Sequence, residues 1–351
     1  MSGALSERSG PGEAGSSDWY TFRMALDFLA VGDITTDTFI RLKQAEVHRD
    51  AATGENEIEM QWGAKIPYEF AVEVNGVGNA ANAAVASSRL GLASGFLSWV
   101  GKDAFGDADV AVLRKEGVDT SSVTRIDGSS NHDFVLWFGS ERTILVKHSP
   151  APYAVPEGFE APRFLYLSSV GDATGTFHLA LAEWLAKHPE TTFAFQPGLE
   201  LAKGREPLKA LYARADICIM NKQEAEALLG HTTDTDIQQL LREMAALGVK
   251  TSLITDGANG AYAYDGKQTL LVPMYPDPAL PYDRTGAGDA FASTVVSALA
   301  LGKPLEEALL WGPVNSMSVV QKIGAQEGLL PRTEIERFLA AAPASYKLTK
   351  L

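Results

Sequence analysis

Short hydrophobic runs alternate with helical patterns along most of this chain. The runs are typical of strands buried on both faces of a sheet, and they fall at residues 27–31, 94–100, 163–167, 192–195, 216–220 and 251–254. Apolar positions spaced three and four apart predict helices between them, at residues 80–90, 107–116, 177–187, 224–229 and 237–246. From residue 286 onward the pattern is mostly helical. This alternation predicts an α/β fold with a mostly parallel sheet and helices on both faces.

Two segments break this rhythm. Residues 57–62 alternate strictly between polar and apolar, which predicts a strand with one solvent-facing side, and residues 39–47 and 68–74 flank it as further strands. Residues 133–138 and 143–147 form a hairpin pattern around the turn at 139–142. These segments predict further strands and a hairpin outside the alternating pattern.

The two ends of the chain read differently from the rest. Residues 1–23 are rich in Gly, Ser, Glu and Ala without apolar periodicity, which predicts a disordered extension or a remnant of expression cloning. The main domain is then expected over residues 24–345. The segments that break the alternation are inserted in it at about 38–75 and 132–148, and residues 346–351 form a tail.

Composition narrows the partners and the compartment. The net charge of −14 disfavours nucleic acid and anionic membrane surfaces. The single cysteine, Cys218, lies in an apolar run and allows no internal disulfide, which fits a reducing cytoplasm. The sequence has neither a signal-peptide pattern nor an apolar stretch long enough to span a membrane. We therefore expect a cytoplasmic protein that binds neither nucleic acid nor membrane.

The most informative motif is the run from Asp283 to Phe291, Asp-Arg-Thr-Gly-Ala-Gly-Asp-Ala-Phe. Gly286, Ala287 and Gly288 are small enough for backbone N–H groups to approach a ligand, and an apolar helical pattern follows. The N-terminus of a helix binds phosphate through unpaired N–H groups and the helix dipole. Asp289 is a poor phosphate ligand but a good base for a hydroxyl that attacks phosphorus.

This run resembles the C-terminal signature of the ribokinase-like (PfkB) carbohydrate kinases. Further motifs of that family occur along the chain in the family's order. They lie at residues 32–37, 76–82, 221–224 and 255–257, and at Asn315 with residues 324–326. The resemblance spans residues 26–339. It implies a ribokinase-like, doubly wound sheet with a small β-sheet lid over the sugar site, often paired with a second subunit's lid in a homodimer. The lid aromatics Trp62, Trp137 and Phe138 suit the site lining, a dimer contact or ordinary packing.

The resemblance also implies the acceptor and catalytic residues. Asp289 is the general base, and the backbone of Gly286, Ala287, Gly288 and Asp289 forms the anion hole. Acceptor hydroxyls are expected to bind a second set of residues: Asp37, Gly78, Asn79, Asn82 and Asp289 itself. A carboxylate suits this role because it only accepts hydrogen bonds. Val77 and Asn79 depart from the commonest family pattern, which weakens any assignment to ribose.

The nucleotide and metal residues come from the same resemblance. ATP is expected to bind Asn221, Thr255, Gly257, Gly286, Gly288 and Asn315. Glu224 should organise Mg²⁺ through its waters, since Mg²⁺ keeps much of its hydration shell. Asp283 and Thr285 could hold a monovalent cation such as K⁺. Arg284 either reaches the phosphates or points to solvent.

Together these predictions describe an ATP-dependent kinase that moves the γ-phosphate to a primary hydroxyl of a small sugar or sugar derivative. A nucleoside kinase of the adenosine type is the alternative, and it would need an apolar slot for a base. A non-catalytic sugar- or nucleotide-binding regulator on the same fold is a third reading. Asp289 and the Asn221/Glu224 pair argue against it, because a binding protein has no use for a base.

Overall fold

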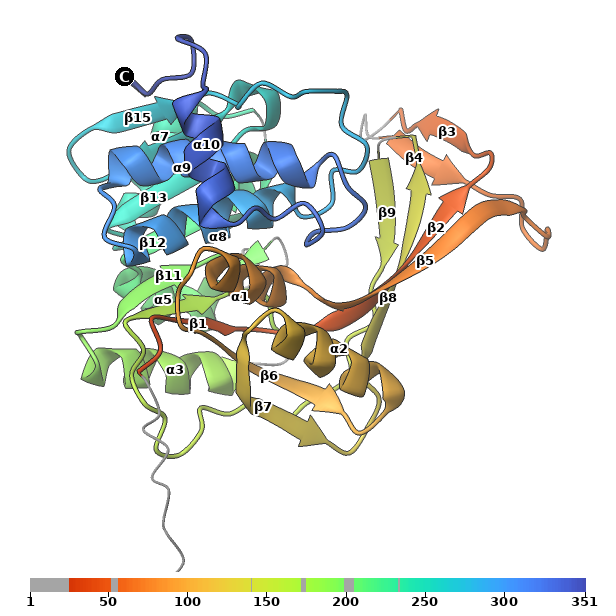
Figure 1. Ribbon diagram of the computed structural model, residues 1–351, viewed down its shortest axis with the longest axis horizontal. Coiled ribbons are helices and arrows are strands. Elements are labelled where there is room, and N and C mark those ends of the chain that lie inside the picture. The colour runs from red at the N-terminus through yellow and green to blue at the C-terminus, as the bar shows by residue number, and fades with distance from the viewer. Residues whose placement is uncertain (1–24, 52–55, 140, 172–174, 199–204, 233) are drawn as a thin grey trace, which may run out of the picture.

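The computed structural model describes residues 25–51, 56–139, 141–171, 175–198, 205–232 and 234–351. The expected extension at residues 1–23 lies outside them. A large sheet with helices on both faces forms the main body, and a smaller sheet projects from one side of it (Figure 1). The predicted α/β class with a mostly parallel sheet and a small second sheet is confirmed.

The main sheet has ten strands among the described residues, in the order β16-β15-β14-β13-β12-β11-β10-β1-β6-β7. Its strands from β13 to β7 pair in parallel, and β14, β15 and β16 continue antiparallel. The bounds are β1 Phe28–Val31, β6 Ser94–Gly101, β7 Asp119–Ile126, β10 Phe164–Leu167, β11 Thr192–Phe195, β12 Ile217–Asn221, β13 Thr251–Thr255, β14 Ala261–Tyr264, β15 Thr269–Val272 and β16 Thr349–Lys350.

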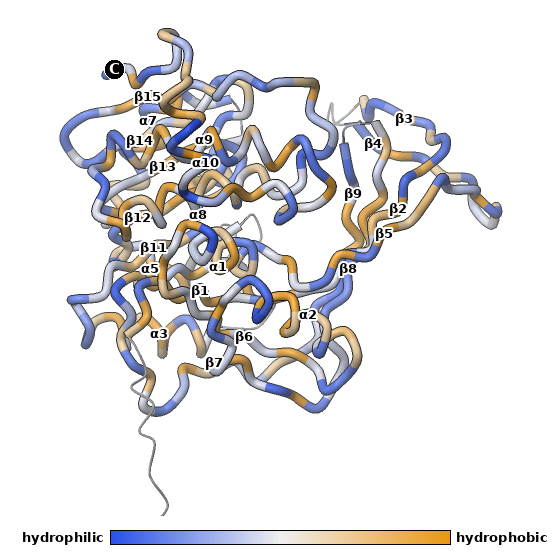
Figure 2. The backbone as a smooth tube through the Cα atoms, viewed as in Figure 1, coloured by the Kyte–Doolittle hydropathy of each residue, from blue (hydrophilic) through white to orange (hydrophobic). Residues whose placement is uncertain are grey.

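Helices cover both faces of the sheet and bury two separate hydrophobic cores. One core packs under α1 Asn79–Arg89, α2 Ala104–Lys115, α8 Ala287–Ala300, α9 Leu305–Val319 and α10 Arg332–Ala340. The other packs under α3 Gly175–Lys187, α5 Arg205–Arg214, α6 Lys222–Leu229 and α7 Ile237–Ala246. Helices α1 and α8 lie mostly on the hydrophobic side of the scale in Figure 2, as their burial requires.

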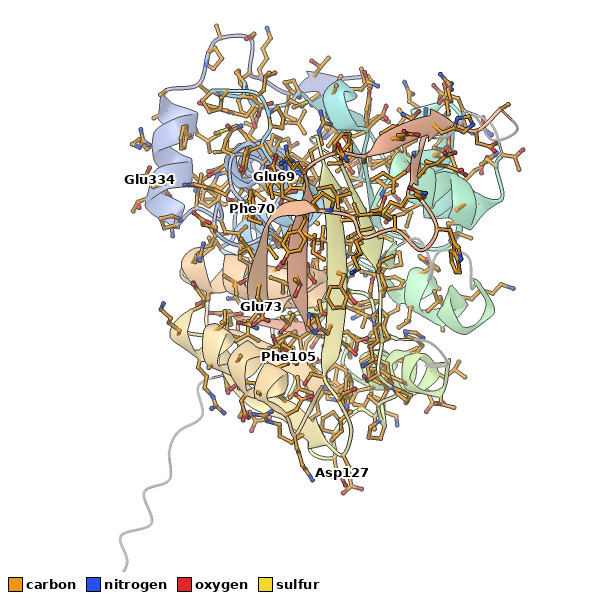
Figure 3. All side chains as sticks on the ribbon, turned by 90° about the vertical axis from the view of Figure 1, so that its right-hand side faces the viewer. Glu69, Phe70, Glu73, Phe105, Asp127 and Glu334 are labelled. Carbon is orange, nitrogen blue, oxygen red and sulfur yellow. The ribbon has the colours of Figure 1, made fainter. Side chains whose placement is uncertain are left out.

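The smaller sheet, which we call the lid, has the order β5-β2-β8-β9. Its bounds are β2 Thr35–Leu42, β5 Tyr68–Val77, β8 Asn131–Phe138 and β9 Glu141–Leu145, and Figure 3 looks onto this sheet. The strand expected at residues 39–47 is wrong. The chain pairs from Thr35 to Leu42, turns, and forms a separate ribbon of β3 Glu46–Arg49 and β4 Asn56–Glu59.

Two of the lid aromatics have different environments. Trp137 is 1% exposed and packs edge-on against Tyr282 of the main body, with ring centroids 5.0 Å apart. The Arg41 guanidinium lies 4.3 Å from the centre of the Trp137 ring. Trp62 is 99% exposed. Trp137 therefore attaches the lid to the main body.

The strand order reverses at β1, because the chain adds β6 on one side of β1 and later β10 on the other. Ligands of open α/β sheets bind where the order reverses, outside the carboxyl ends of the strands. The loops after β1 and β10 meet there, since Asp33 N donates to Ser169 O at 2.9 Å. The topology thus selects one edge of the sheet for a site.

The C-terminal end of the chain packs against the main body. Residues 346–351, expected to be a tail, include β16, which pairs with β15 at the sheet edge. Tyr346 is buried and donates to Leu310 O at 2.6 Å. Among the described residues, every helix is too short or too polar to cross a membrane.

Candidate active site

Helix α8 begins directly after the glycine-rich motif, and its first residues are shaped by tight packing. Gly286, the N-cap, has φ of 76°, and a Cβ there would overlap Ala325. Only glycine satisfies both conditions without strain. The N–H groups of the first turn, which have no partners within the helix, therefore start beside Gly286.

Asp289 lies in this first turn, and two amide side chains hold its carboxylate. Asn82 of α1 donates to Oδ2 at 2.8 Å, and Gln196, which follows β11, donates to Oδ1 at 3.0 Å. Burial raises the pKa of Asp289, and these two hydrogen bonds partly offset that rise. The two donors favour the ionised form and fix the direction in which it can take a proton.

Both amides are themselves oriented by further partners. The Tyr166 hydroxyl donates to Gln196 Oε1, and Gln326 Nε2 donates to Asn82 Oδ1 at 3.0 Å. Asn82, expected to bind acceptor hydroxyls, thus bonds the expected base, and its binding to the acceptor stays a prediction. Gln326 belongs to the last of the family motifs, whereas Gln196 and Tyr166 were missed from the sequence, because side chains from separate elements meet only in the fold.

We predict that Gln196→Met moves the acidic limb of the kcat profile to higher pH. The substitution removes a hydrogen bond that stabilises the Asp289 carboxylate, so the pKa of Asp289 rises. A base works only when ionised, so activity then requires a higher pH. Tyr166→Phe is the matched control, because it removes the hydroxyl behind Gln196 and leaves the bond to Asp289. An unmoved limb in Gln196→Met would separate Asp289 from the rate-determining proton transfer.

Asp37 lies on β2 of the lid, opposite Asp133 of β8. Burial, then the charges of Asp133 and Asp109, raise the pKa of Asp37 to about 7. Among the described residues, none donates a hydrogen bond to its carboxylate, in contrast to Asp289. A half-buried carboxylate of this kind is well suited to accept hydrogen bonds from ligand hydroxyls.

Gly78 and Asn79 lie at the start of α1 on the same side of the sheet. Gly78 is the N-cap with φ of 112°, and a Cβ there would lie 3.0 Å from Asp33 O. Asn79 is the first helical residue and is partly exposed. The structure therefore places this motif at the carboxyl end of β1, where the strand order reverses.

A second polar cluster, missed from the sequence, lies at the same edge. The Asp33 carboxylate accepts from the Tyr153 hydroxyl at 2.9 Å and pairs with His148 Nδ1 at 2.9 Å. Gly171 N donates to the same Tyr153 hydroxyl at 3.2 Å. These contacts connect the loops after β1, β9 and β10, so they fix the edge on which the acceptor residues stand.

A cavity of about 320 Å³ lies on the other side of the α8 N-terminus. Thr255, Gly257 and Gly288, three of the expected ATP residues, line it together with apolar side chains such as Phe291 and Met317. Arg284 also lines it, and its guanidinium lies 3.6 Å from the Glu141 carboxylate of the lid. The lining combines apolar side chains with residues at the N-terminus of α8, which suits an adenine with its phosphates.

Asn315 is placed elsewhere than the motif implies. It is 0% exposed, donates to Thr294 Oγ1 at 2.7 Å and accepts from Leu330 N at 2.9 Å. A buried amide requires such partners. Its neighbours Ser316 and Met317 line the cavity instead.

Asn221 and Glu224 form a capping box at the start of α6. Asn221 Oδ1 accepts from Glu224 N at 2.8 Å, and Glu224 Oε2 accepts from Asn221 N at 2.9 Å. Burial raises the pKa of Glu224, and the charge of Asp289 raises it further. Neither residue lines the cavity. The two residues therefore cap helix α6, which the N-x-x-E spacing itself could have predicted.

The expected cation residues are also bonded to each other. Asp283 Oδ1 accepts from Thr285 N at 2.9 Å and from Thr285 Oγ1 at 2.7 Å, and Oδ2 accepts from Gly324 N at 2.8 Å. These bonds fix the loop before α8. Throughout the described ranges, no group of three or more His, Cys, Asp or Glu side chains is arranged to hold a metal ion. A monovalent cation at Asp283 and Thr285 stays a prediction.

Comparison with known proteins agrees with this geometry. The model of the pfkB family carbohydrate kinases matches residues 56–332. Ribokinase of Haemophilus influenzae is 28% identical over 76% of this chain and 87% of its own. ATP-dependent 6-phosphofructokinase of Thermoanaerobacterium thermosaccharolyticum is 26% identical over 71% of this chain and 80% of its own. The nucleoside kinase of Methanocaldococcus jannaschii has the same fold, with a TM-score of 0.74 at 20% identity over 90% of this chain and 99% of that one.

The matched residues cover most of the chain, and the fold agrees with theirs. The chain belongs to the pfkB family of carbohydrate kinases. It is an ATP-dependent kinase of the sugar-phosphorylating type.

Proposed function

We propose that this kinase transfers the γ-phosphate of ATP to a primary hydroxyl of a small sugar or sugar derivative, with Asp289 as the general base. The observation that carries the proposal is the position of Asp289. It is held by Asn82 and Gln196 on one side, and it directly follows Gly288, which lines the nucleotide cavity. A base there can reach a hydroxyl and lie next to a transferring phosphate at once.

The chemistry follows from these residues. Asp289 takes the proton of the acceptor hydroxyl while the hydroxyl oxygen forms a bond to the γ-phosphorus. The bond between that phosphorus and the β–γ bridging oxygen breaks, which releases ADP. The N–H groups of Gly286 to Asp289 stabilise the negative charge on the transferring group. Asp37 accepts hydrogen bonds from the other acceptor hydroxyls and so orients the attacking one.

Mg²⁺ neutralises phosphate charge in phosphoryl transfer when it is bound. Glu224 is the residue we propose for holding it, through water. One carboxylate oxygen of Glu224 accepts a hydrogen bond in the capping box, and the other accepts none from the described residues. That oxygen and the negative charge fit a hydrated divalent cation.

We predict that Glu224→Gln raises the Mg²⁺ concentration for half-maximal rate several-fold and leaves the acceptor KM nearly unchanged. Glutamine at this position preserves the capping box and removes only the charge, so helix α6 stays intact. Measuring the rate against Mg²⁺ at saturating ATP checks the effect. Glu226→Gln, on the same helix, is the control. Equal Mg²⁺ dependence in wild type and Glu224→Gln would remove Glu224 from the metal site.

The lid gives no support to the nucleoside alternative. Trp137, the most suitable ring for stacking a base, is buried between Arg41 and Tyr282. The named relatives differ in acceptor: one is a ribokinase and one a 6-phosphofructokinase. Both act on sugars, which supports a sugar acceptor and leaves its substituents open.

We also propose a homodimer through the outer face of the lid. Phe134 and Leu145 are register partners there and are 41% and 53% exposed. Exposed apolar side chains on neighbouring strands are typical of an interface. Sedimentation equilibrium tests this, and a monomer at all concentrations would contradict it.

A panel of acceptors with Mg-ATP tests the function. Ribose, fructose, 2-keto-3-deoxygluconate, adenosine, guanosine and cytidine are each incubated with the enzyme, and the products are located by phosphorus NMR. We expect a sugar or sugar acid to be phosphorylated on a primary hydroxyl. Turnover of nucleosides alone would replace the sugar assignment, and no turnover with ATP still bound would favour the non-catalytic reading.

A further inference from the structure

Arg142 is a lid residue to which neither the motifs nor the family comparison gives a role. It lies on β9 opposite Trp137 of β8, and Trp137 in turn is opposite Arg41 of β2. Register partners share one face of a sheet, and residues two apart return to it. Arg142 therefore lies on the same face as Trp137 and Asp37, which is the face turned towards the main body.

Arg142 is partly exposed, but one of its guanidinium nitrogens is buried without a partner among the described residues. This nitrogen is Nε. No salt bridge to a carboxylate is found for it within the same ranges. A buried cationic donor without an acceptor is unfavourable, and such groups usually bind a ligand or a water. The lid therefore holds a guanidinium whose partner comes from outside the protein.

Two carboxylates indicate where this guanidinium lies. The charge of Arg142 lowers the pKa of Asp37 and the pKa of Asp289. Asp37 is the proposed acceptor ligand and Asp289 the proposed base, so Arg142 is close to the acceptor. Neither carboxylate uses it: Asp289 is held by Asn82 and Gln196, and Asp37 makes no ion pair with it. If Arg142 served only to neutralise these carboxylates, it would form an ion pair with one of them, and it forms none.

We infer that Arg142 is a specificity residue that binds an anionic group of the acceptor, a carboxylate or a phosphate. This rests on the proposed function and names its substrate class: a sugar acid or a sugar phosphate instead of a neutral sugar. The planar guanidinium offers parallel N–H donors that match the two oxygens of either anion. Asp37 and Asp133 repel an anion, so a cation beside them is what makes an acidic acceptor possible.

The test compares charged and neutral acceptors in four proteins. We measure kcat/KM for 2-keto-3-deoxygluconate, fructose 6-phosphate and fructose with wild type, Arg142→Gln, Arg142→Lys and the control Arg41→Gln. Arg41 lies on the same face but stacks on Trp137 and donates to Gly139 O. The two anionic acceptors separate a carboxylate from a phosphate.

We expect wild type to favour one anionic acceptor over fructose. Arg142→Gln should lower kcat/KM for that acceptor by about 10- to 150-fold, the worth of a charged hydrogen bond, and change fructose by less than about threefold. Arg142→Lys should keep part of the preference, and Arg41→Gln all of it. A preference for fructose in wild type would overturn the inference. So would equal losses for all acceptors in Arg142→Gln, which would assign Arg142 to the transferring phosphate.

Calorimetry of acceptor binding, without turnover, separates this inference from the proposed function. If an anionic acceptor binds wild type and not Arg142→Gln while no acceptor is phosphorylated, the anion site stands and the kinase assignment to these acceptors fails. If fructose is phosphorylated and neither anionic acceptor binds, the kinase assignment stands and the anion site is wrong. If no acceptor binds at all, the anion site is wrong as well.

Discussion

Asp289→Asn is expected to fold and bind ATP but to lose about 10²- to 10⁴-fold in turnover, the usual worth of general-base catalysis. Asparagine has nearly the same shape as aspartate and cannot accept the hydroxyl proton. The N–H groups at the start of α8 stay in place, because Gly286 and its packing against Ala325 are unchanged. The loss should therefore appear in kcat and leave nucleotide affinity nearly intact.

The same substitution should cost some stability. The Asp289 carboxylate accepts from Asn82 and Gln196 together, whereas an asparagine has one oxygen and an N–H₂ group. The side-chain amides of Asn82 and Gln196 cannot flip, because Gln326 and Tyr166 donate hydrogen bonds to their oxygens. One donor is then left facing another, at a cost of about 1–3 kcal/mol. Urea unfolding checks this, and Ser293→Ala on the same helix serves as control. Near-normal kcat would remove Asp289 from the mechanism.

The sequence predicts the main body well for a physical reason. A parallel strand is buried on both faces, so it is a continuous hydrophobic run, and six such runs were found. The strands missed were β7, β14, β15 and β16, which lie towards the two ends of the sheet. β7 is largely polar, as Asp-Thr-Ser-Ser shows, because strands at or near an edge need fewer apolar residues. Short antiparallel strands at an edge leave little pattern in a sequence.

The site shows the same limit more clearly. The glycine motif and Asp289 could be chosen from local chemistry, and Asp37 from the family resemblance. What holds Asp289 could not, since Asn82 and Asp289 are 207 positions apart and Gln196 belongs to a third element. Conversely, Asn315 matches the family motif but does not line the cavity, because its side-chain amide makes hydrogen bonds to Thr294 and Leu330. A motif gives the residue type, and the topology decides its partner.

The second large effect concerns Asp37. We expect Asp37→Asn to weaken acceptor binding and, at the same time, to stabilise the protein without ligand. Loss of the carboxylate removes a charged hydrogen bond to the acceptor, which should raise KM about 10- to 150-fold with a smaller change in kcat. Wild type should in addition show an acidic limb in kcat/KM for the acceptor near pH 7, because the pKa of Asp37 is about 7 and the ionised carboxylate makes the stronger, charge-assisted hydrogen bonds to the acceptor hydroxyls.

The stability gain follows from the same pKa. The value is raised from 3.8 to about 7, so the folded state holds a proton that the unfolded state has released over that window. Ionising Asp37 therefore costs folding free energy as pH rises from about 4 to 7, and the whole cost is present above pH 7. At about 1.36 kcal/mol for each pKa unit the upper limit is roughly 4 kcal/mol, and screening by water should reduce it by about half.

Asp37→Asn should thus be more stable than wild type by roughly 2 kcal/mol at pH 8 and nearly equal to it at pH 4, as measured by urea unfolding at both values. The control is Asp127→Asn, a fully exposed lysine-paired carboxylate far from the site, which should give no gain at pH 8. A gain of the same size at pH 4 would mean that packing, not charge, is responsible. Equal stability at pH 8 with an unchanged acceptor KM would show that Asp37 neither carries the buried charge nor binds the acceptor.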